Sequence, residues 1–143
     1  MTMTNTGAYF GSISGAAVAR AADAMLRCMG GDEVQLVMPA MGMPPDPSGE
    51  LGLVDPGVEL ISFAPVVIRT LATANNGPRR RLEVLLPASA IQEELVARNI
   101  ASAGGLFDGA LGVTHDGEMF HIEGYATEYF AGSAYLYRLV IVD

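Results

Sequence analysis

The sequence predicts a mainly β (α+β) protein: a small antiparallel β-barrel or sandwich with an N-terminal helix and a short helical insertion. An amphipathic helical pattern occupies about residues 14–29. Most of the later chain consists of apolar or alternating runs, separated by turns such as Asp116-Gly117. Strands that follow one another through hairpin turns form antiparallel sheets, to which helices are then attached.

Length and composition set the domain plan. The chain has 143 residues, which fits one domain. We expect a flexible N-terminal arm at 1–12 and a single β-rich domain at 13–143, with a long loop at 39–57 and a helical insertion at 87–111. Half of the residues are hydrophobic. Either the core is rich in Ala and Val, or neighbouring subunits cover some apolar surface.

Charge limits the partners. The net charge is −8, and all eight basic residues are Arg. Affinity for nucleic acid comes mostly from cations that neutralise phosphates. A chain as acidic as this one is therefore a poor candidate for tight binding to DNA. An acidic surface can still line a channel through which DNA slides. The single cysteine, Cys28, excludes an intrachain disulfide. No apolar run approaches roughly 18 residues, so we expect no membrane span.

The first patterned segment is the helix at about 14–29. Thr, Gly and Ser dominate residues 1–12 and predict the flexible arm. Ser14 is a suitable N-cap, and Gly30-Gly31 supplies the end of the helix. Apolar residues recur on one helical face, at Val18, Ala22, Met25, Leu26 and Met29.

A short strand at 33–38 precedes the long loop at 39–57. This loop contains five prolines and four glycines, which prevent regular helix or sheet. A long irregular segment within a compact domain is usually functional or mobile. A disordered insertion is the alternative interpretation. Pliable apolar side chains predict an adaptable contact with a partner subunit, at Met41, Met43, Leu51 and Leu53.

The middle of the chain predicts a hairpin followed by two helices. The hairpin covers 58–86, with its turn at 75–78, and its strands are rich in β-branched and apolar residues. The first helix of the insertion begins at Ser89, where Ser89 and Gln92 fit a capping box. A second, short helix is expected at 103–111.

The C-terminal third predicts three strands, at 112–115, 118–129 and 134–142. Asp116-Gly117 is the strongest short hairpin signal in the chain. The last strand is apolar on both faces for much of its length. Such a strand is either central in the sheet or covered by a partner.

A search for catalytic patterns finds none that is complete. His115 and His121 flank a turn that contains Asp116, but their spacing matches no known metal pattern. Cys28 has no surrounding signature of a nucleophile. The segment GSISG differs from a nucleophile elbow because its third residue is Ile13. We therefore predict that the protein is not an enzyme and has no cofactor and no metal site.

Arg79, Arg80 and Arg81 form the basic cluster of the chain and begin the returning strand of the hairpin. We expect them to contact an acidic patch on a partner subunit. Contact with DNA phosphate, or a solvated turn, are the alternatives.

Aromatic residues are concentrated in the last two expected strands. A tyrosine combines an apolar ring with a polar hydroxyl, so it suits both a core and an interface, and both interpretations stay open. Tyr135 and Tyr137 are our candidates for a partner contact. The same group includes Tyr125, Tyr129 and Phe130.

Two parts of the chain resemble the small head–tail joining proteins of lambda-like siphophages. The segment from Ala16 to Leu36, AAVARAADAMLRCMGGDEVQL, resembles their start, where an Ala- and Arg-bearing helix ends in a Met-Gly step before the first strand. The C-terminal order is also similar: a turn with Gly, a strand of the type E-x-F-x-I-x-G from Glu118 to Gly124, a loop with Gly132, and a closing strand from Tyr135 to Val142.

This resemblance implies a small β-barrel or sandwich with a helix and no catalytic residues. It also implies a homo-oligomeric ring of sixfold or twelvefold symmetry that joins the portal or adaptor to the tail. Genomic DNA would pass through the ring without sequence-specific binding, in a virion assembled in the cytoplasm of the host bacterium. The long loop at 39–57 and the insertion at 87–111 depart from the small lambda-type protein, which leaves the position in the neck open.

Three functions are therefore compatible with the sequence. The first is a structural virion protein, a ring subunit of the head–tail connector (neck) of a tailed phage. The second is another component of the particle: a tail terminator, a tail tube protein or a decoration protein. The third is a host enzyme or small-ligand binding domain in which His115, His121 and Asp116 converge in a pocket.

Overall fold

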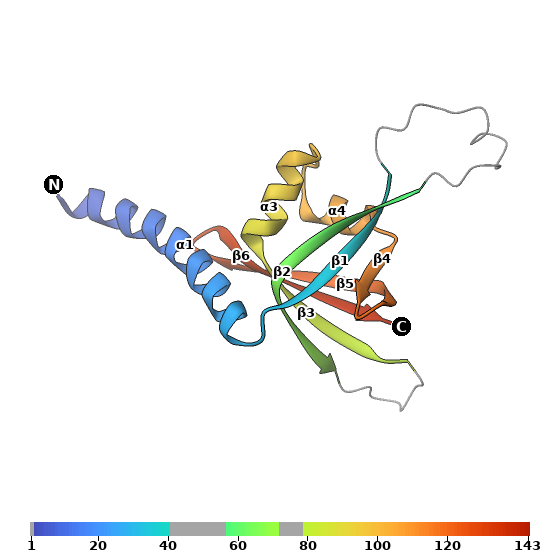
Figure 1. Ribbon diagram of the computed structural model, residues 1–143. Coiled ribbons are helices and arrows are strands. Elements are labelled where there is room, and N and C mark those ends of the chain that lie inside the picture. The colour runs from blue at the N-terminus through green and yellow to red at the C-terminus, as the bar shows by residue number, and fades with distance from the viewer. Residues whose placement is uncertain (1, 41–56, 72–78) are drawn as a thin grey trace.

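The computed structural model describes residues 2–40, 57–71 and 79–143 (Figure 1). The strands close into an antiparallel barrel in the order β1-β2-β3-β6-β5-β4, which confirms the predicted fold class. The strands are β1 (Asp32–Pro39), β2 (Val58–Leu71), β3 (Arg81–Pro87), β4 (Gly112–His115), β5 (Glu118–Phe130) and β6 (Ser133–Val142). The helices of the described ranges are α1 (Thr2–Cys28), α3 (Ala88–Ala97) and α4 (Ala103–Gly109).

β2 and β5 each change partner midway, and this closes the barrel. β2 pairs with β1 as far as Val66 and with β3 from Val67 onward. β5 pairs with β4 as far as Phe120 and with β6 from His121 onward. A register shift next to Gly124 bends β5 close to its change of partner. Each of the two strands therefore belongs to two sheets.

The core fills the barrel and extends to the end that α3 and α4 cover (Figure 1). Side chains alternate across the strands, so that Leu139 and Ile141 of β6 are buried inside the barrel. The two short helices complete the core with apolar side chains such as Ile91 of α3 and Leu106 and Phe107 of α4. Each helix is held in place by this burial.

Helix α1 lies outside the barrel, against β2, β3 and β6 (Figure 1). Its Leu26 is buried and packs in a small second cluster with Val67, Leu85 and Leu136. The helix ends before Gly31, whose backbone N–H donates to the carbonyl of Leu26 at 3.1 Å. This end is the one that the glycine pair predicted.

The start of α1 corrects the predicted helix start at about residue 14, because the helix begins at Thr2. The flexibility expected for residues 1–12 stays a prediction. Thr, Ser and Gly lower helix stability by no more than about 1 kcal/mol per residue relative to Ala. No proline interrupts residues 2–28. The helix therefore extends to the N-terminal side of the predicted cap at Ser14.

The start of α3 corrects the predicted capping box at Ser89 and Gln92. The N-cap residue is Pro87, and no side chain caps the helix. Because β3 runs directly into α3, Ser89 lies inside the first turn, and its hydroxyl donates instead to Asp23 Oδ2 of α1 at 3.1 Å. A side-chain cap occurs at α4, where Ser102 Oγ accepts from a backbone N–H at 3.3 Å.

Two hairpin turns have left-handed backbone at both central residues. Asp116 (φ 50°) and Gly117 (φ 78°) join β4 to β5, as predicted. Ala131 (φ 51°) and Gly132 (φ 78°) join β5 to β6. This conformation matches the right-handed twist of the flanking strands. The two turns therefore set the register of the last three strands.

Candidate functional site

The candidate contact residues of the long loop lie outside the part of the chain that the structure describes. The described chain reaches this loop from two neighbouring positions, because Pro39 of β1 pairs with Val58 of β2. The loop therefore leaves and rejoins the barrel at the same place. Its assignment to a partner contact stays a prediction for Met41, Met43, Leu51 and Leu53.

The predicted basic cluster is largely paired within the chain. Arg80 forms ion pairs with Glu118 and, at 3.1 Å, with Asp143. Arg81 makes two hydrogen bonds with Glu123, at 2.7 and 3.0 Å. The hydrogen bonds from Arg80 lower the pKa of Asp143. These pairs tie the start of β3 to β5 and to the C-terminus.

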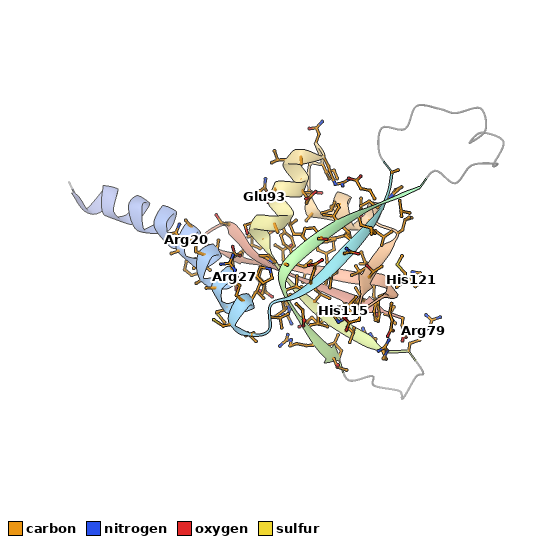
Figure 2. The ribbon with its side chains drawn as sticks, in the orientation of Figure 1. Arg20, Arg27, Arg79, Glu93, His115 and His121 are labelled. Atoms are coloured by element: carbon orange, nitrogen blue, oxygen red, sulfur yellow. The ribbon has the colours of Figure 1, made fainter. Side chains whose placement is uncertain are left out.

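Arg79 has no ion-pair partner among the described residues, and the same holds for Arg20 and Arg27. Figure 2 shows Arg20 and Arg27 on α1 and Arg79 on the other side of the barrel. These three arginines therefore do not form one basic patch. Of the predicted cluster, Arg79 is the member that keeps its charge available to a partner.

Tyr137 packs into the core and is 9% exposed, which leaves little of its surface for the predicted partner contact. Its ring lies edge-on to Phe107, with 6.1 Å between the ring centroids. Burial raises the pKa of Tyr137, and the nearby Tyr129 and Tyr125 raise it further. Tyr135 is half-buried and keeps some surface.

An exposed aromatic surface follows the second half of β5. Tyr125 packs against Phe107, with 5.0 Å between their ring centroids, and is still partly exposed. Tyr129 is 66% exposed, and Phe130 is also exposed. Aromatic side chains are enriched in the centres of protein interfaces. The sequence showed that aromatic residues gather here, but not which of them face solvent.

The same half of β5 has an unpaired backbone edge. β4 pairs with β5 only from Glu118 to Phe120, and beyond this point no described strand lies on that side. In the segment 121–130, alternate backbone N–H and C=O groups therefore point away from β6. We call this segment the β5 edge. Such an edge is a template for pairing with another strand.

A groove of about 300 Å³ runs beside the β5 edge. The segment from Phe107 to Leu111 lines one side, and residues 121–125 of β5 line the other. Asp108 and Glu123 line this groove, and Glu123 is paired with Arg81 at 2.7 Å. The groove lies between the segment 107–111 and β5, and α4 contacts the β5 edge where Phe107 packs on Tyr125.

Charged side chains form a ladder on the outer face of β2, β3, β6 and β5. Glu83 accepts hydrogen bonds from Arg69 and, at 3.2 Å, from Arg138. Arg138 also donates to Glu128 at 3.0 Å. Burial by itself would raise the pKa of Glu83, but the hydrogen bonds from the two guanidinium groups outweigh it and lower the pKa. The ladder joins four neighbouring strands.

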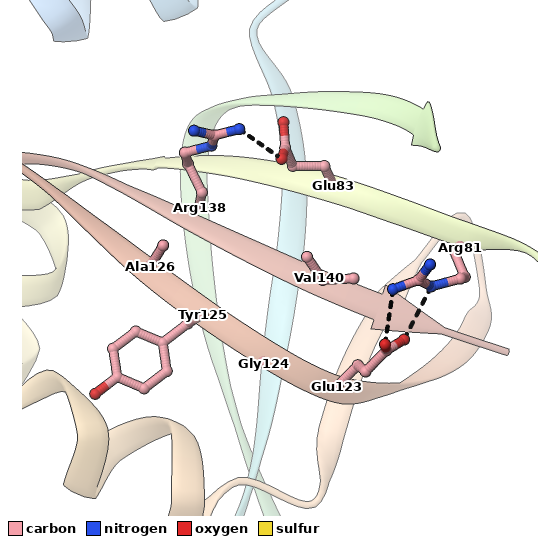
Figure 3. Close-up of a pocket in the computed structure, with 8 residues that line it drawn as sticks. All are labelled: Arg81, Glu83, Glu123, Gly124, Tyr125, Ala126, Arg138 and Val140. Carbon is pink, nitrogen blue, oxygen red and sulfur yellow. Dashed lines mark hydrogen bonds and ion pairs between the residues drawn. The ribbon is translucent and has the colours of Figure 1, made fainter. Parts of the chain in front are cut away.

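A second groove, of about 390 Å³, lies on this outer face next to the β5 edge (Figure 3). Its floor consists of Gly124, Ala126 and Val140. The ion pairs of Arg81 and Glu83 bound it at either end (Figure 3). We call it the outer groove. The small residues of its floor leave room for side chains from another molecule.

The two histidines do not converge on one site. His115 Nδ1 lies 3.3 Å from the carbonyl oxygen of Glu33, and its Nε2 lies 3.3 Å from Asp116 Oδ2. His121 lines the groove beside α4 instead. Over the described ranges, no group of three or more His, Cys, Asp or Glu side chains is placed to hold a metal ion. Cys28 is exposed near the end of α1.

Comparison with protein-family models, curated proteins and solved structures found no match for this chain. Among the described residues, no helix combines the length and the apolar character needed to cross a membrane. The β5 edge, its aromatic surface and the two grooves beside it together form the candidate site. This arrangement is suited to binding an extended segment of protein.

Proposed function

We propose that this protein is a structural virion protein that forms a ring in the head–tail connector (neck) of a tailed phage. The ring joins the portal or adaptor to the tail around the DNA channel. The observation that carries this proposal is the β5 edge with its exposed aromatic side chains. A monomer leaves this backbone and these rings in water, whereas a neighbouring subunit covers them.

The charge of the chain suits the wall of a DNA channel. The net charge is −8, so carboxylates outnumber guanidinium groups. An acidic wall repels the DNA phosphates, which lets DNA slide through without sticking. Most arginines are already neutralised within the chain, namely Arg69, Arg80, Arg81, Arg98 and Arg138.

The resemblance to head–tail joining proteins supports the same proposal. The similar segment from Ala16 to Leu36 lies on the second half of α1 and on β1. The E-x-F-x-I-x-G pattern from Glu118 to Gly124 lies on β5, at its change of partner. A barrel with an N-terminal helix is the fold class that this resemblance implies.

Quantitative mass spectrometry of particles tests the proposal. Particles are induced and banded from the host that encodes the chain, and the peptides of this protein are counted against the portal. We expect about 6 or 12 copies per particle. Hundreds of copies would favour a tail tube or decoration protein, and absence from banded particles would contradict a virion role.

A further inference from the structure

We infer that neighbouring copies of this chain join by strand pairing, in which the β5 edge of one copy adds to an open edge of β2, residues 58–64, in the next copy. The inference deepens the proposed function, because it names the contact that closes the ring. It rests on the self-assembly that the proposed function requires, and not on the place of the ring in a particle.

β2 has an open edge of its own. β3 pairs with β2 from Val67 to Leu71, and after Pro87 the chain turns into α3. Residues 58–64 therefore have β1 on one side and, within the described chain, no strand on the other. Helix α3 packs mainly on β3 and β6, and its C-cap residue Arg98 forms an ion pair with Glu59 of this segment at 2.6 Å. We call residues 58–64 the β2 edge.

The two edges belong to different strands, so pairing between them is heterologous. Each copy offers its β5 edge to one neighbour and its β2 edge to the other. A contact of this type repeats around an axis and closes a ring where the rotation allows. Pairing of two β5 edges would stop at a dimer and leave both β2 edges open. For this reason we assign the β2 edge of a second copy as the occupant.

The side chains of the two edges are complementary in size. On the outer face of the β2 edge, Val58 and Leu60 are 57% and 51% exposed. On the outer face of the β5 edge, Gly124 and Ala126 form the floor of the outer groove (Figure 3). In a continuous sheet, side chains of the same face lie side by side. Large apolar side chains of one copy then fill the groove of the next.

The β5 edge lacks two of the features that commonly prevent edge pairing, Lys and Pro, although its register with β6 shifts next to Gly124 and between Glu128 and Tyr129. Exposed edge strands are commonly blunted by Lys or Pro. Residues 121–130 contain neither. The two acidic residues of this segment, Glu123 and Glu128, are paired with Arg81 and Arg138. The edge therefore presents little net charge to an incoming strand.

Disulfide trapping tests the contact directly. In a Cys28→Ala background, Ala126→Cys is combined with Leu60→Cys or, in a second variant, with Ser62→Cys, which sample two registers. We expect oxidation to produce a ladder of cross-linked oligomers in at least one variant. The matched control combines Ala126→Cys with Thr70→Cys, an exposed residue in the half of β2 that already pairs with β3. We expect no ladder from the control.

A charge on the β5 edge provides a second test. Ala126→Lys adds a cation at an exposed position in the middle of the edge, and Thr70→Lys adds the same charge elsewhere. We expect Ala126→Lys to weaken self-association at least tenfold, measured by light scattering after gel filtration, with an unchanged Tm of the monomer. We expect Thr70→Lys to self-associate like the wild type.

Three results would overturn the inference: no ladder from either cysteine pair, unchanged association of Ala126→Lys, or a wild-type chain that is monomeric at about 1 mM. The proposed function fails separately. A ladder from a protein that is absent from banded particles contradicts the neck role and supports strand pairing. A particle-bound protein that gives no ladder supports the neck role and rejects strand pairing.

Discussion

The carboxylate of Glu83 on β3 accepts a hydrogen bond from Arg138 on β6 at 3.2 Å, while only 7% of the Glu83 side chain is exposed. Arg69 of β2 is its second partner. The carboxylate is thus removed from water and depends on two donors, whereas both guanidinium groups are about half exposed and keep contact with water. This difference in burial decides what the loss of each member costs.

We predict that loss of the two arginines is more damaging than loss of the glutamate. Glu83→Gln should lower the free energy of unfolding by about 1–2 kcal/mol, because both guanidinium groups can still be hydrated. The double variant Arg69→Ala, Arg138→Ala should lower it further, because a buried carboxylate is left unpaired. Urea unfolding at pH 7 measures both. A smaller loss of unfolding free energy in the double variant than in Glu83→Gln would show that the buried carboxylate does not depend on Arg69 and Arg138.

The stability of the fold should fall in acid partly through Glu83. Its pKa in the folded protein lies below the ordinary value of 4.5, so the folded state binds the proton more weakly than the unfolded state. The contribution is complete above the unfolded pKa and is lost as the pH falls below about 4.5 through the folded pKa. In Glu83→Gln, urea unfolding between pH 7 and pH 3 should therefore show a shallower loss. Parallel curves for wild type and variant would refute this.

Two glycines should respond differently to alanine. A Cβ at Gly112 would lie 2.5 Å from the carbonyl oxygen of Phe120 and 2.6 Å from Met119 Cε, whereas a Cβ at Gly124 would meet no atom within 4 Å. Gly112→Ala should lower the free energy of unfolding by about 1–3 kcal/mol, because the backbone of β5 must shift. Gly124→Ala, the control, should stay within about 0.5 kcal/mol. Equal effects would mean that β4 does not approach β5 so closely.

Helix α1 should depend on one side chain for its attachment to the barrel. Leu26 is 3% exposed and fills the space between Val67, Leu85 and Leu136, whereas the adjacent Met25 is 60% exposed. Leu26→Ala should lower the free energy of unfolding by about 2–4 kcal/mol. Met25→Ala should change it by less than about 0.5 kcal/mol. Thermal and urea unfolding measure both, and a similar loss in the two variants would contradict the described face of α1.

Local patterns predicted most of the secondary structure. The turn at Asp116-Gly117 was predictable because both residues tolerate left-handed backbone, and it lies where expected. That Ser89 does not cap α3 was not predictable from the neighbouring residues. Its hydroxyl bonds to Asp23, 66 residues earlier, and this contact exists only because α1 and α3 meet in the folded chain.

The candidate site was predictable only in part. The sequence identified Arg80 and Arg81 as a basic cluster, but Glu118 and Glu123, which pair with them, lie 38 and 42 residues away. The concentration of aromatic residues in the last strands was visible, whereas the burial of Tyr137 beside Phe107 was not. One signal for the open edge was present in the sequence. The strand predicted before the Asp116-Gly117 turn is much shorter than the strand predicted after it, so it can pair with only part of that strand.

Periodicity and turn chemistry act between neighbouring residues, so the sequence predicted most of the strands, the two short helices and the turn at Asp116-Gly117, but not the helix that begins at Thr2. Which backbone remains unpaired depends on contacts between distant segments. β4 pairs with β5 only at residues 118–120, which leaves residues 121–130 with no described strand on that side. β3 pairs with β2 only at residues 67–71, because the chain then continues from β3 into α3. Whether a strand edge is open depends on where its neighbours end in space, which no local pattern along the chain records.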